Sequence, residues 1–218
     1  MMEENCATSL PRLGEPAPNF EASSTHGKIS LAGYKGRWVV LFSHPADFTP
    51  VCTTEFVAFS GIAEELARRN TQLVGLSIDS VYSHIAWVRN IKEKLGAEVP
   101  FPIIADLDMK VAKLYGMIHE KMSTTSAVRS LFVIDDKGIL RAMIYYPMTT
   151  GRNMDEVVRL IVALQAADEH KIATPANWRP GDKVIIPAPS TADGAKMRMG
   201  EGYECVDWYL CKKTIPLK

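Results

Sequence analysis

One stretch of fourteen residues, from Phe42 to Glu55, connects an apolar run to an amphipathic pattern. The run before it, residues 38–42 (Trp-Val-Val-Leu-Phe), is β-branched and aromatic, which is typical of a buried strand. After it, apolar side chains recur every three or four residues with charged side chains between them, at Phe56, Phe59, Ile62, Ala63 and Leu66. This spacing predicts a helix over residues 49–70 with one buried face.

The start of that helix places a cysteine in a special position. Thr49 suits the N-cap, and Pro50 suits the first helical position, where its missing N–H costs nothing. Cys52 then falls in the first turn, where unpaired backbone N–H groups and the helix dipole favour a thiolate. Such positions lower a cysteine pKa from about 8.5 by one to several units. Although free cysteines are usually small buried hydrophobes, Cys52 with the Thr49 hydroxyl beside it indicates an activated nucleophile.

These residues carry a family resemblance. Pro45-x-x-x-Thr49-x-x-Cys52 is similar to the active-site pattern of the peroxiredoxins. The longer string over residues 43–56 resembles the subfamily centred on 1-Cys enzymes and their archaeal and bacterial relatives. The similarity continues through 75–84, 102–106, 128–129 and 145–147 and into the tail. It covers nearly the whole chain and implies a thiol peroxidase.

Composition sets the broad class of the protein. The chain has 218 residues, 47% of them apolar, and equal numbers of basic and acidic residues (25 each), which favours neither nucleic acid nor an anionic membrane as a partner. No apolar run is long enough to span a bilayer, and the acidic N-terminus is no secretory signal. Four cysteines do not make a secreted disulfide framework, so we expect a cytoplasmic protein. Cys6, in an irregular tail, is interpreted as incidental.

The order of predicted elements indicates a mixed α/β fold. Strands near residues 38–42, 73–78, 101–105, 131–134 and 139–146 alternate with helices to give the order β-α-β-α-β-α-β-β-α. The helix that Asp79 or Ser80 caps is expected to bury Ile85, Val88, Ile91 and Leu95. The last long helix is expected to turn Val157, Val158, Leu160, Ile161 and Leu164 inward. This order fits a thioredoxin-like architecture, which the resemblance also implies, with a central mixed sheet flanked by helices.

The composition changes at Thr174, where prolines become frequent. We therefore expect a thioredoxin-like peroxidase domain over 1–173 and an extended C-terminal arm over 174–218. The arm is too short and proline-rich to bury much surface alone. Its apolar residues, 184–186 and the group Tyr203, Trp208, Tyr209 and Leu210, indicate packing on a partner subunit. The resemblance implies homodimers that assemble into rings, usually decamers.

Peroxide reduction needs a thiolate, donors that hold the O–O bond in line, and charge stabilisation for the leaving oxygen. Cys52 supplies the thiolate, and the Thr49 hydroxyl and nearby backbone N–H groups can hold the peroxide. Arg129 matches the active-site arginine of the family, and its guanidinium stays protonated beside a thiolate. The resemblance implies that Pro45, Thr49, Cys52 and Arg129 are catalytic and that no cofactor or metal is needed.

Three further residues each have two interpretations. Glu55 either orients Arg129 through a bidentate pair or satisfies the dipole of the first helical turn. Arg152 resembles a second, less essential site arginine, but equally fits a solvated or helix-capping residue. His44 either contacts the substrate or packs the loop. His84 is interpreted as structural.

Cys205 and Cys211 are candidates to react with a sulfenic acid at Cys52, which condenses readily with a second thiol. The minimal 1-Cys pattern lacks this pair. In archaeal members with a similar tail, the second cysteine resolves the sulfenate of the neighbouring subunit and the first can form a disulfide with it. The resemblance thus implies Cys211 as resolver and Cys205 as accessory. Thioredoxin or another small thiol is the implied reductant, and hydrogen peroxide and alkyl hydroperoxides are the implied substrates.

Several rival functions are disfavoured. A zinc site at Cys205 and Cys211 would have unusually wide spacing and no further pair to complete four ligands. A thioredoxin-type reductase needs C-x-x-C, but residue 55 is glutamate. The segment 75–79 lacks the last glycine of an acyl hydrolase Gly-x-Ser-x-Gly motif. The alternative outside enzymology is an oligomeric holdase chaperone, a behaviour of overoxidised peroxiredoxin rings.

Overall fold

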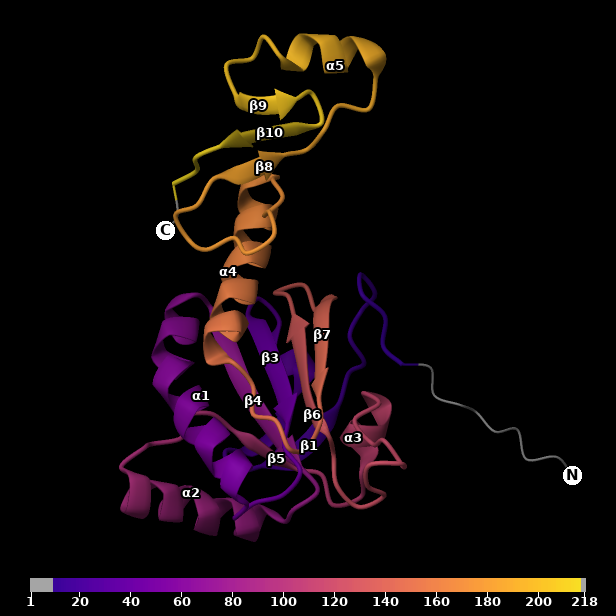
Figure 1. Cartoon of the computed structure of the whole chain (residues 1–218). Helices are drawn as coiled ribbons and strands as arrows, with labels where there is room; N and C mark the ends of the chain where they lie inside the picture. Colours follow the sequence, from indigo (N-terminus) through magenta and orange to yellow (C-terminus); the bar gives the residue numbers. More distant parts are fainter. Residues whose placement is uncertain (1–9, 217–218) are drawn as a thin grey trace, which may run out of the picture. The chain divides into compact units, whose positions relative to one another are not determined.

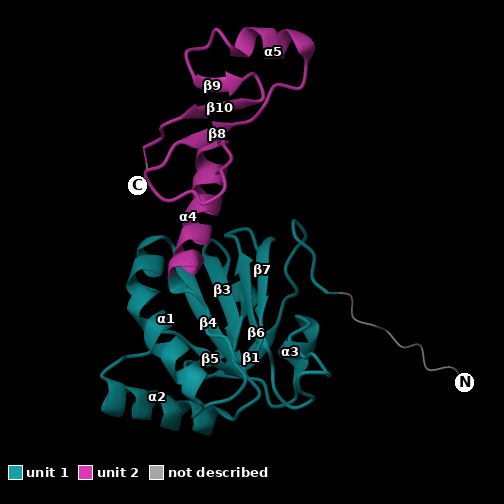
Figure 2. Cartoon of the chain, viewed as in Figure 1, with its two compact units in different colours: residues 1–154 teal, residues 155–218 magenta. Residues whose placement is uncertain are grey.

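The computed structural model describes residues 10–216, so Cys6 lies outside the described residues. The chain forms two compact units, residues 1–154 and 155–218 (Figure 2). This division comes earlier than the expected change at residue 174. It does so because a long helix over Met154–His170 shares its apolar face with the residues that follow it. None of the described helices is both long and apolar enough to cross a membrane.

The first unit is built on a seven-stranded mixed sheet flanked by helices (Figure 1). The strand order is β2-β1-β5-β4-β3-β6-β7. The strands are β1 (Glu21–Ser24), β2 (Gly27–Ser30), β3 (Trp38–Ser43), β4 (Thr71–Ser77), β5 (Ile103–Ala105), β6 (Arg129–Ile134) and β7 (Leu140–Tyr146). The helices are η1 (Leu31–Tyr34), α1 (Pro50–Arg68), α2 (Val81–Leu95) and α3 (Lys110–Leu114). The predicted thioredoxin-like fold and the predicted order of its central elements are confirmed.

Strand β3 lies inside this sheet, between β4 and β6. All six of its residues are buried, because it pairs in parallel with β4 on one side and antiparallel with β6 on the other. The antiparallel pairing brings the start of β6 to the end of β3, where Phe42 faces Leu131. The strand therefore ends at a point where side chains from β6 and the start of α1 can meet.

An aromatic cluster fixes α1 against the sheet. The ring of Phe42 on β3 stacks on Phe59 of α1 with centroids 3.9 Å apart, and Phe56 lies 5.6 Å from the same ring. Phe101, two residues before β5, and Trp87 of α2 also contact this group. Aromatic pairs of this kind contribute roughly 0.5–1.5 kcal/mol each beyond the area they bury.

The buried face of α2 matches the prediction only in part. Of the four residues expected inward, Ile91 is buried and Val88 is half-buried, but Ile85 and Leu95 are 53% and 54% exposed. His84 and Trp87 are buried on this face instead. Positions 84, 87 and 91 are spaced by three and four residues, so they fit one face of a helix as well as the four predicted positions do. His84 is buried because it finds hydrogen-bond partners inside the protein, and Trp87 packs beside it on the same face.

The second unit has its own small sheet and apolar cluster. It comprises α4 (Met154–His170, from Asp155 onward), β8 (Val184–Ile186), α5 (Ala192–Arg198), β9 (Glu204–Asp207) and β10 (Leu210–Lys213), with strand order β8-β10-β9. Of the predicted inward residues of α4, Val157 and Ile161 are buried, and Val158, Leu160 and Leu164 are half-buried. The cluster packs Trp178, 1% exposed, with Val162, Ala163, Ala166, Ile172, Val184 and Ile215. The arm thus buries apolar surface together with α4.

The reassigned face of α2 predicts a contrast between two isoleucines. Ile91→Ala, at 1% exposure, should lower the free energy of unfolding by about 2–5 kcal/mol, because it leaves a cavity. Ile85→Ala on the same helix should change it by no more than about 0.5 kcal/mol. Denaturant titrations of both variants measure this difference, and equal losses would contradict the assigned face.

Candidate active site

The candidate site begins where β3 meets α1. Thr49 is the N-cap of α1, with an extended backbone (φ −105°, ψ 148°), and Pro50 is the first helical residue, as predicted. Cys52 lies in the first turn and is completely buried as a free thiol. The Thr49 side chain does not cap the helix; its hydroxyl donates to the Ala46 carbonyl at 2.8 Å. That oxygen keeps lone pairs with which to accept a further hydrogen bond.

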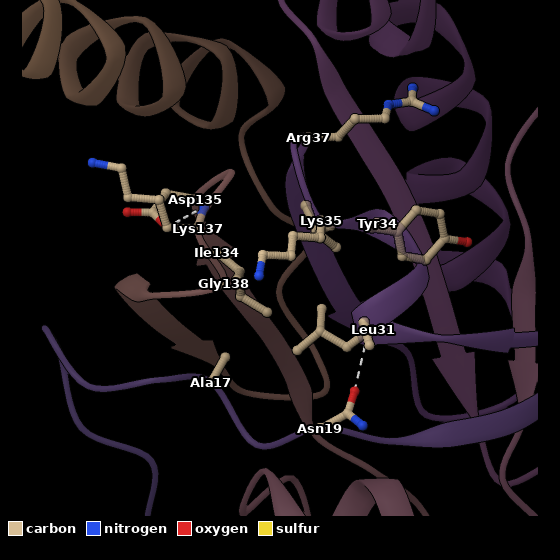
Figure 3. A pocket seen from close by; sticks show the side chains of 12 residues that line it. Ala17, Asn19, Leu31, Tyr34, Lys35, Arg37, Ile134, Asp135, Lys137 and Gly138 are labelled. Carbon is tan, nitrogen blue, oxygen red and sulfur yellow. Dashed lines mark hydrogen bonds between the residues drawn. The ribbon is translucent and has the colours of Figure 1, made fainter.

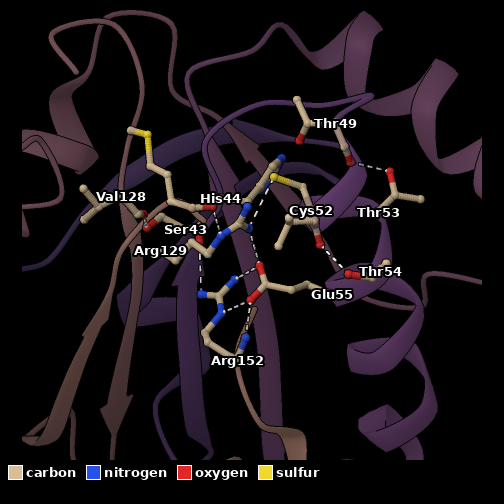
Figure 4. Close-up of polar contacts among 12 residues, drawn as sticks. Ser43, His44, Thr49, Cys52, Thr53, Thr54, Glu55, Val128, Arg129 and Arg152 are labelled. Atoms are coloured by element: carbon tan, nitrogen blue, oxygen red, sulfur yellow. Dashed lines mark hydrogen bonds and ion pairs between the residues drawn. The ribbon is translucent and has the colours of Figure 1, made fainter. Parts of the chain in front are cut away.

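Arg129 reaches Cys52 from the first residue of β6. Its Nη1 lies 3.4 Å from the Cys52 Sγ and 2.6 Å from the Glu55 Oε2 (Figure 4). Its Nε donates to the Met148 carbonyl at 2.9 Å, which fixes the plane of the guanidinium. Arg129 is only 2% exposed, so its positive charge acts on the sulfur with little screening by water. The contact places a buried guanidinium against the sulfur.

Glu55 holds two arginines at once. One turn after Cys52, its Oε2 accepts from Arg129 and from the Arg152 Nη2 at 2.7 Å, and its Oε1 accepts from the Arg152 Nε at 2.7 Å. Glu55 therefore contacts Arg129, as the first of its two interpretations expects, but through one oxygen only, and the bidentate pair is with Arg152. Burial alone would raise the pKa of Glu55, but the hydrogen bonds of Arg152 and the charges of Arg152 and Arg129 lower it.

Arg152 is a buried residue and is not solvated at the surface. It is 8% exposed, and its Nη1 donates to the carbonyls of Ser43, at 3.0 Å, and Ser130, at 2.8 Å. Its guanidinium also lies 5.2 Å from the ring centroid of Phe42. Arg152 thus joins the end of β3, the start of β6 and Glu55 of α1. The fit to a second site arginine is the interpretation that this geometry supports.

A buried cluster supports the loop between β3 and α1. His44 is fully buried, and its Nε2 lies 2.8 Å from the Asp47 Oδ1. The Nδ1 of His84 lies 2.8 Å from the other carboxylate oxygen, and its Nε2 lies 3.1 Å from the Ile104 carbonyl. Pro45 is half-buried between His44 and Asp47 along the chain. Among the described residues, the Nδ1 of His44 has no hydrogen-bond partner. The contacts of His84 lie inside the protein, which is what its structural interpretation expects.

These contacts limit the roles of the ring nitrogens. A carbonyl only accepts, so the hydrogen bond between His84 and Ile104 is donated by the His84 Nε2, while its Nδ1 faces a carboxylate oxygen of Asp47. Burial lowers the pKa of His44, and the hydrogen bond and charge of Asp47 offset this only in part. Burial alone would raise the pKa of Asp47, but its two histidine partners lower it.

Asp47 is a residue that the sequence analysis missed. It stands inside the motif, but its importance depends on His84, which lies 37 positions away. His44, Asp47 and His84 are also the described side chains that group as metal ligands might. Each carboxylate oxygen of Asp47 already pairs with a ring nitrogen at hydrogen-bond distance, so the geometry is explained without an ion.

The second cysteine pair lies in the second unit. Cys205 on β9 and Cys211 on β10 face each other in the strand register and form a disulfide. Cys205 is half-buried and Cys211 is 1% exposed.

A separate cavity of about 190 Å³ lies at the other end of β3, near Arg37 and Val39. Figure 3 shows the Lys35 side chain extending among its lining residues. Apolar side chains of Leu31 and Ile134 also line it. Because β3 ends at Ser43, this cavity is distant along the strand from Cys52. It contributes no residue to the candidate active site.

Two family profiles match the chain. Residues 13–143 match the AhpC/TSA family, and residues 163–202 match the C-terminal domain of 1-Cys peroxiredoxin. The first covers the sheet with Cys52, Glu55 and Arg129. The second begins within α4 and ends just before the hairpin that carries Cys205 and Cys211.

Similar proteins cover almost the whole chain. A peroxiredoxin of Aquifex aeolicus is 64% identical and covers 95% of this chain and 98% of its own. A peroxiredoxin of Methanosarcina mazei is 54% identical, covering 94% and 98%. A solved structure of yeast mitochondrial 1-Cys peroxiredoxin is 42% identical, with a TM-score of 0.83, and covers 94% of this chain and 100% of its own.

The buried carboxylate predicts a pH-dependent stability. Because the pKa of Glu55 is lowered in the folded protein, its stabilising effect is complete above the ordinary glutamate pKa of about 4.3 and is lost as the pH falls below it. Glu55→Gln leaves two buried guanidinium groups without their anion. It should cost about 3–5 kcal/mol at neutral pH and reduce the loss of stability in acid.

The control for this variant lies on the same helix. Glu64→Gln removes an 84% exposed carboxylate that pairs with Arg68, so it should change the free energy of unfolding by at most about 1 kcal/mol. Unfolding in denaturant at neutral pH and near pH 4 measures both variants. An unchanged acid dependence in Glu55→Gln would show that this carboxylate does not carry the pH effect.

Proposed function

Because the chain belongs to the peroxiredoxin family of thiol-dependent peroxidases, we propose that it reduces hydrogen peroxide and alkyl hydroperoxides through Cys52. The observation that carries this proposal is the contact between the Arg129 Nη1 and the Cys52 Sγ at 3.4 Å. It places a fixed cation against a nucleophile that is otherwise buried. Water has little access to compete for either group.

The first step is a displacement at oxygen. The Cys52 thiolate attacks one peroxide oxygen, an S–O bond forms and the O–O bond breaks. The other oxygen leaves as hydroxide or alkoxide and takes a proton to become water or an alcohol. Arg129 stabilises the charge as it moves from sulfur to the leaving oxygen. The Thr49 hydroxyl and the N–H groups of the first turn of α1 align the peroxide, and Pro45 shapes the loop beside them.

The second step resolves the sulfenic acid. Cys211, from a neighbouring subunit, attacks the Cys52 sulfur, releases water and forms a disulfide. Cys205 then attacks Cys211, frees Cys52 and leaves the Cys205–Cys211 disulfide. The direct bond between these two cysteines in the second unit supports the last exchange, because it requires both sulfurs within reach. A thiol reductant, thioredoxin or another small thiol, then reduces the pair.

Assembly is part of the proposal. Family members usually act as oligomers, and we infer dimers that form a decameric ring, with the arm over residues 174–218 packed on the partner subunit. Strand β7 supports an association of this kind, because it is an edge of the sheet and has a paired neighbour on one side only among the described strands.

Loss of the nucleophile tests the activity. Wild-type protein should consume hydrogen peroxide in the presence of thioredoxin, thioredoxin reductase and NADPH, and Cys52→Ser should lose this consumption. Cys211→Ser should lose turnover with thioredoxin but still consume one equivalent of peroxide. NADPH oxidation and direct peroxide assays measure these rates, and equal turnover by wild type and Cys52→Ser would reject the assignment.

The order of thiol exchanges predicts a stoichiometry without reductant. Reduced wild type should consume about two equivalents of peroxide per chain, because the Cys205–Cys211 disulfide frees Cys52 for one further oxidation. Cys205→Ser should stop at about one equivalent, with Cys52 bonded to Cys211. Peroxide titration with mass spectrometry of the peptides distinguishes these results. A single equivalent in wild type would contradict the transfer of the disulfide to Cys205.

A further inference from the structure

The two sulfurs of the C-terminal disulfide occupy different environments. Cys211 lies on β10, the middle strand of the order β8-β10-β9, and is 1% exposed. Cys205 lies on β9, at the edge of this sheet, and is half-buried. The neighbours of Cys205 along the chain, Glu204 and Val206, are both exposed. A dissolved thiol can therefore approach one side of the bond more easily than the other.

We propose that the reductant opens this disulfide at Cys205 and that Cys211 is the leaving group. The proposal rests on the proposed function, in which the pair becomes oxidised in each cycle. Thiol exchange proceeds by attack of a thiolate on one of the two sulfurs, and access is one of the factors that select which sulfur is attacked. In the disulfide form of one chain, the sheet gives access to Cys205 and covers Cys211.

The thiol–disulfide exchange proceeds in two steps. A reductant thiolate bonds to the Cys205 Sγ, the bond between Cys205 and Cys211 breaks, and the Cys211 thiolate takes a proton from water. A second thiol of the reductant then attacks the sulfur that the reductant contributed to the mixed disulfide, and Cys205 leaves as a thiolate. The pair gains two electrons, and the reductant becomes a disulfide.

The surroundings of Cys211 suit its role as the leaving group. Its Sγ lies 3.5 Å from the Asp207 carbonyl oxygen. Once reduced and protonated, the thiol can donate a weak hydrogen bond to that oxygen without any movement of the strand. The order of events also matters for the cycle, because the first step already regenerates Cys211, the proposed resolver. Cys205 is released only in the second step.

Trapping of the mixed disulfide tests the proposal. The full-length oxidised protein is mixed with a thioredoxin whose second active-site cysteine is replaced by serine, then quenched in acid and alkylated. Cleavage before Asp207 places Cys205 and Cys211 on different peptides, so mass spectrometry identifies the linked cysteine. We expect thioredoxin on Cys205 and the alkyl group on Cys211. Thioredoxin mainly on Cys211, or shared equally, would overturn the proposal.

A charge change beside Cys205 provides a second test. Val206 is 75% exposed, so Val206→Glu and Val206→Lys should both fold. Glutathione, which is anionic, should open the disulfide several-fold faster in Val206→Lys than in Val206→Glu, whereas 2-mercaptoethanol should distinguish them much less. Equal glutathione rates would place the attack elsewhere.

The two tests are independent of the peroxidase assay. The disulfide can be formed with diamide, so its opening is measured even if peroxide fails to produce it. Failure to detect the Cys205–Cys211 peptide after peroxide would count against the proposed function. Attack at Cys211 in the diamide-oxidised protein would count against the proposed order of opening alone.

Discussion

The carboxylate of Glu55, buried between two guanidinium groups, is the interaction on which the site depends. An ion removed from water is costly unless it is paired and hydrogen-bonded. Here Arg129 and Arg152 supply the pairing, and Glu55, on the first turns of α1, supplies the opposite charge to both. Because Arg152 also binds the carbonyls at the end of β3 and the start of β6, one charged group fixes three elements. Cys52 takes its position from all three.

Local signals were sufficient for the strand, the loop and the helix start. Apolar runs predicted β3 and β4, and the Thr49-Pro50 pair predicted the start of α1 within a residue. The resemblance supplied Arg129, which no local pattern would have selected. These features depend on neighbouring residues in the chain or on a motif, so a single sequence can reveal them.

Features that depend on residues far apart in the sequence were harder to predict. The sequence left Arg152 undecided because its partner Glu55 is 97 positions away. Asp47 was missed because a buried polar side chain looks like a surface residue in a hydrophobic pattern. The buried face of α2 was right at Ile91 but wrong at the exposed Ile85 and Leu95. The boundary between the two units lies at residue 154, and not at residue 174 as expected. The expectation followed the prolines, whereas the apolar face of α4 joins this helix to the second unit.

In the proposed cycle, the charges around Cys52 have a consequence once the sulfur reacts. With a thiolate, two guanidinium groups face two anions, Cys52 and Glu55, and the enclosed charges sum to zero. A sulfenic acid or a disulfide is neutral, so oxidation leaves one positive charge without a counterpart in a site that excludes water. That imbalance raises the free energy of the closed arrangement. Oxidation of Cys52 is therefore expected to destabilise the buried arrangement around it. The first turn of α1 should then loosen at the stage when Cys52 must meet another thiol.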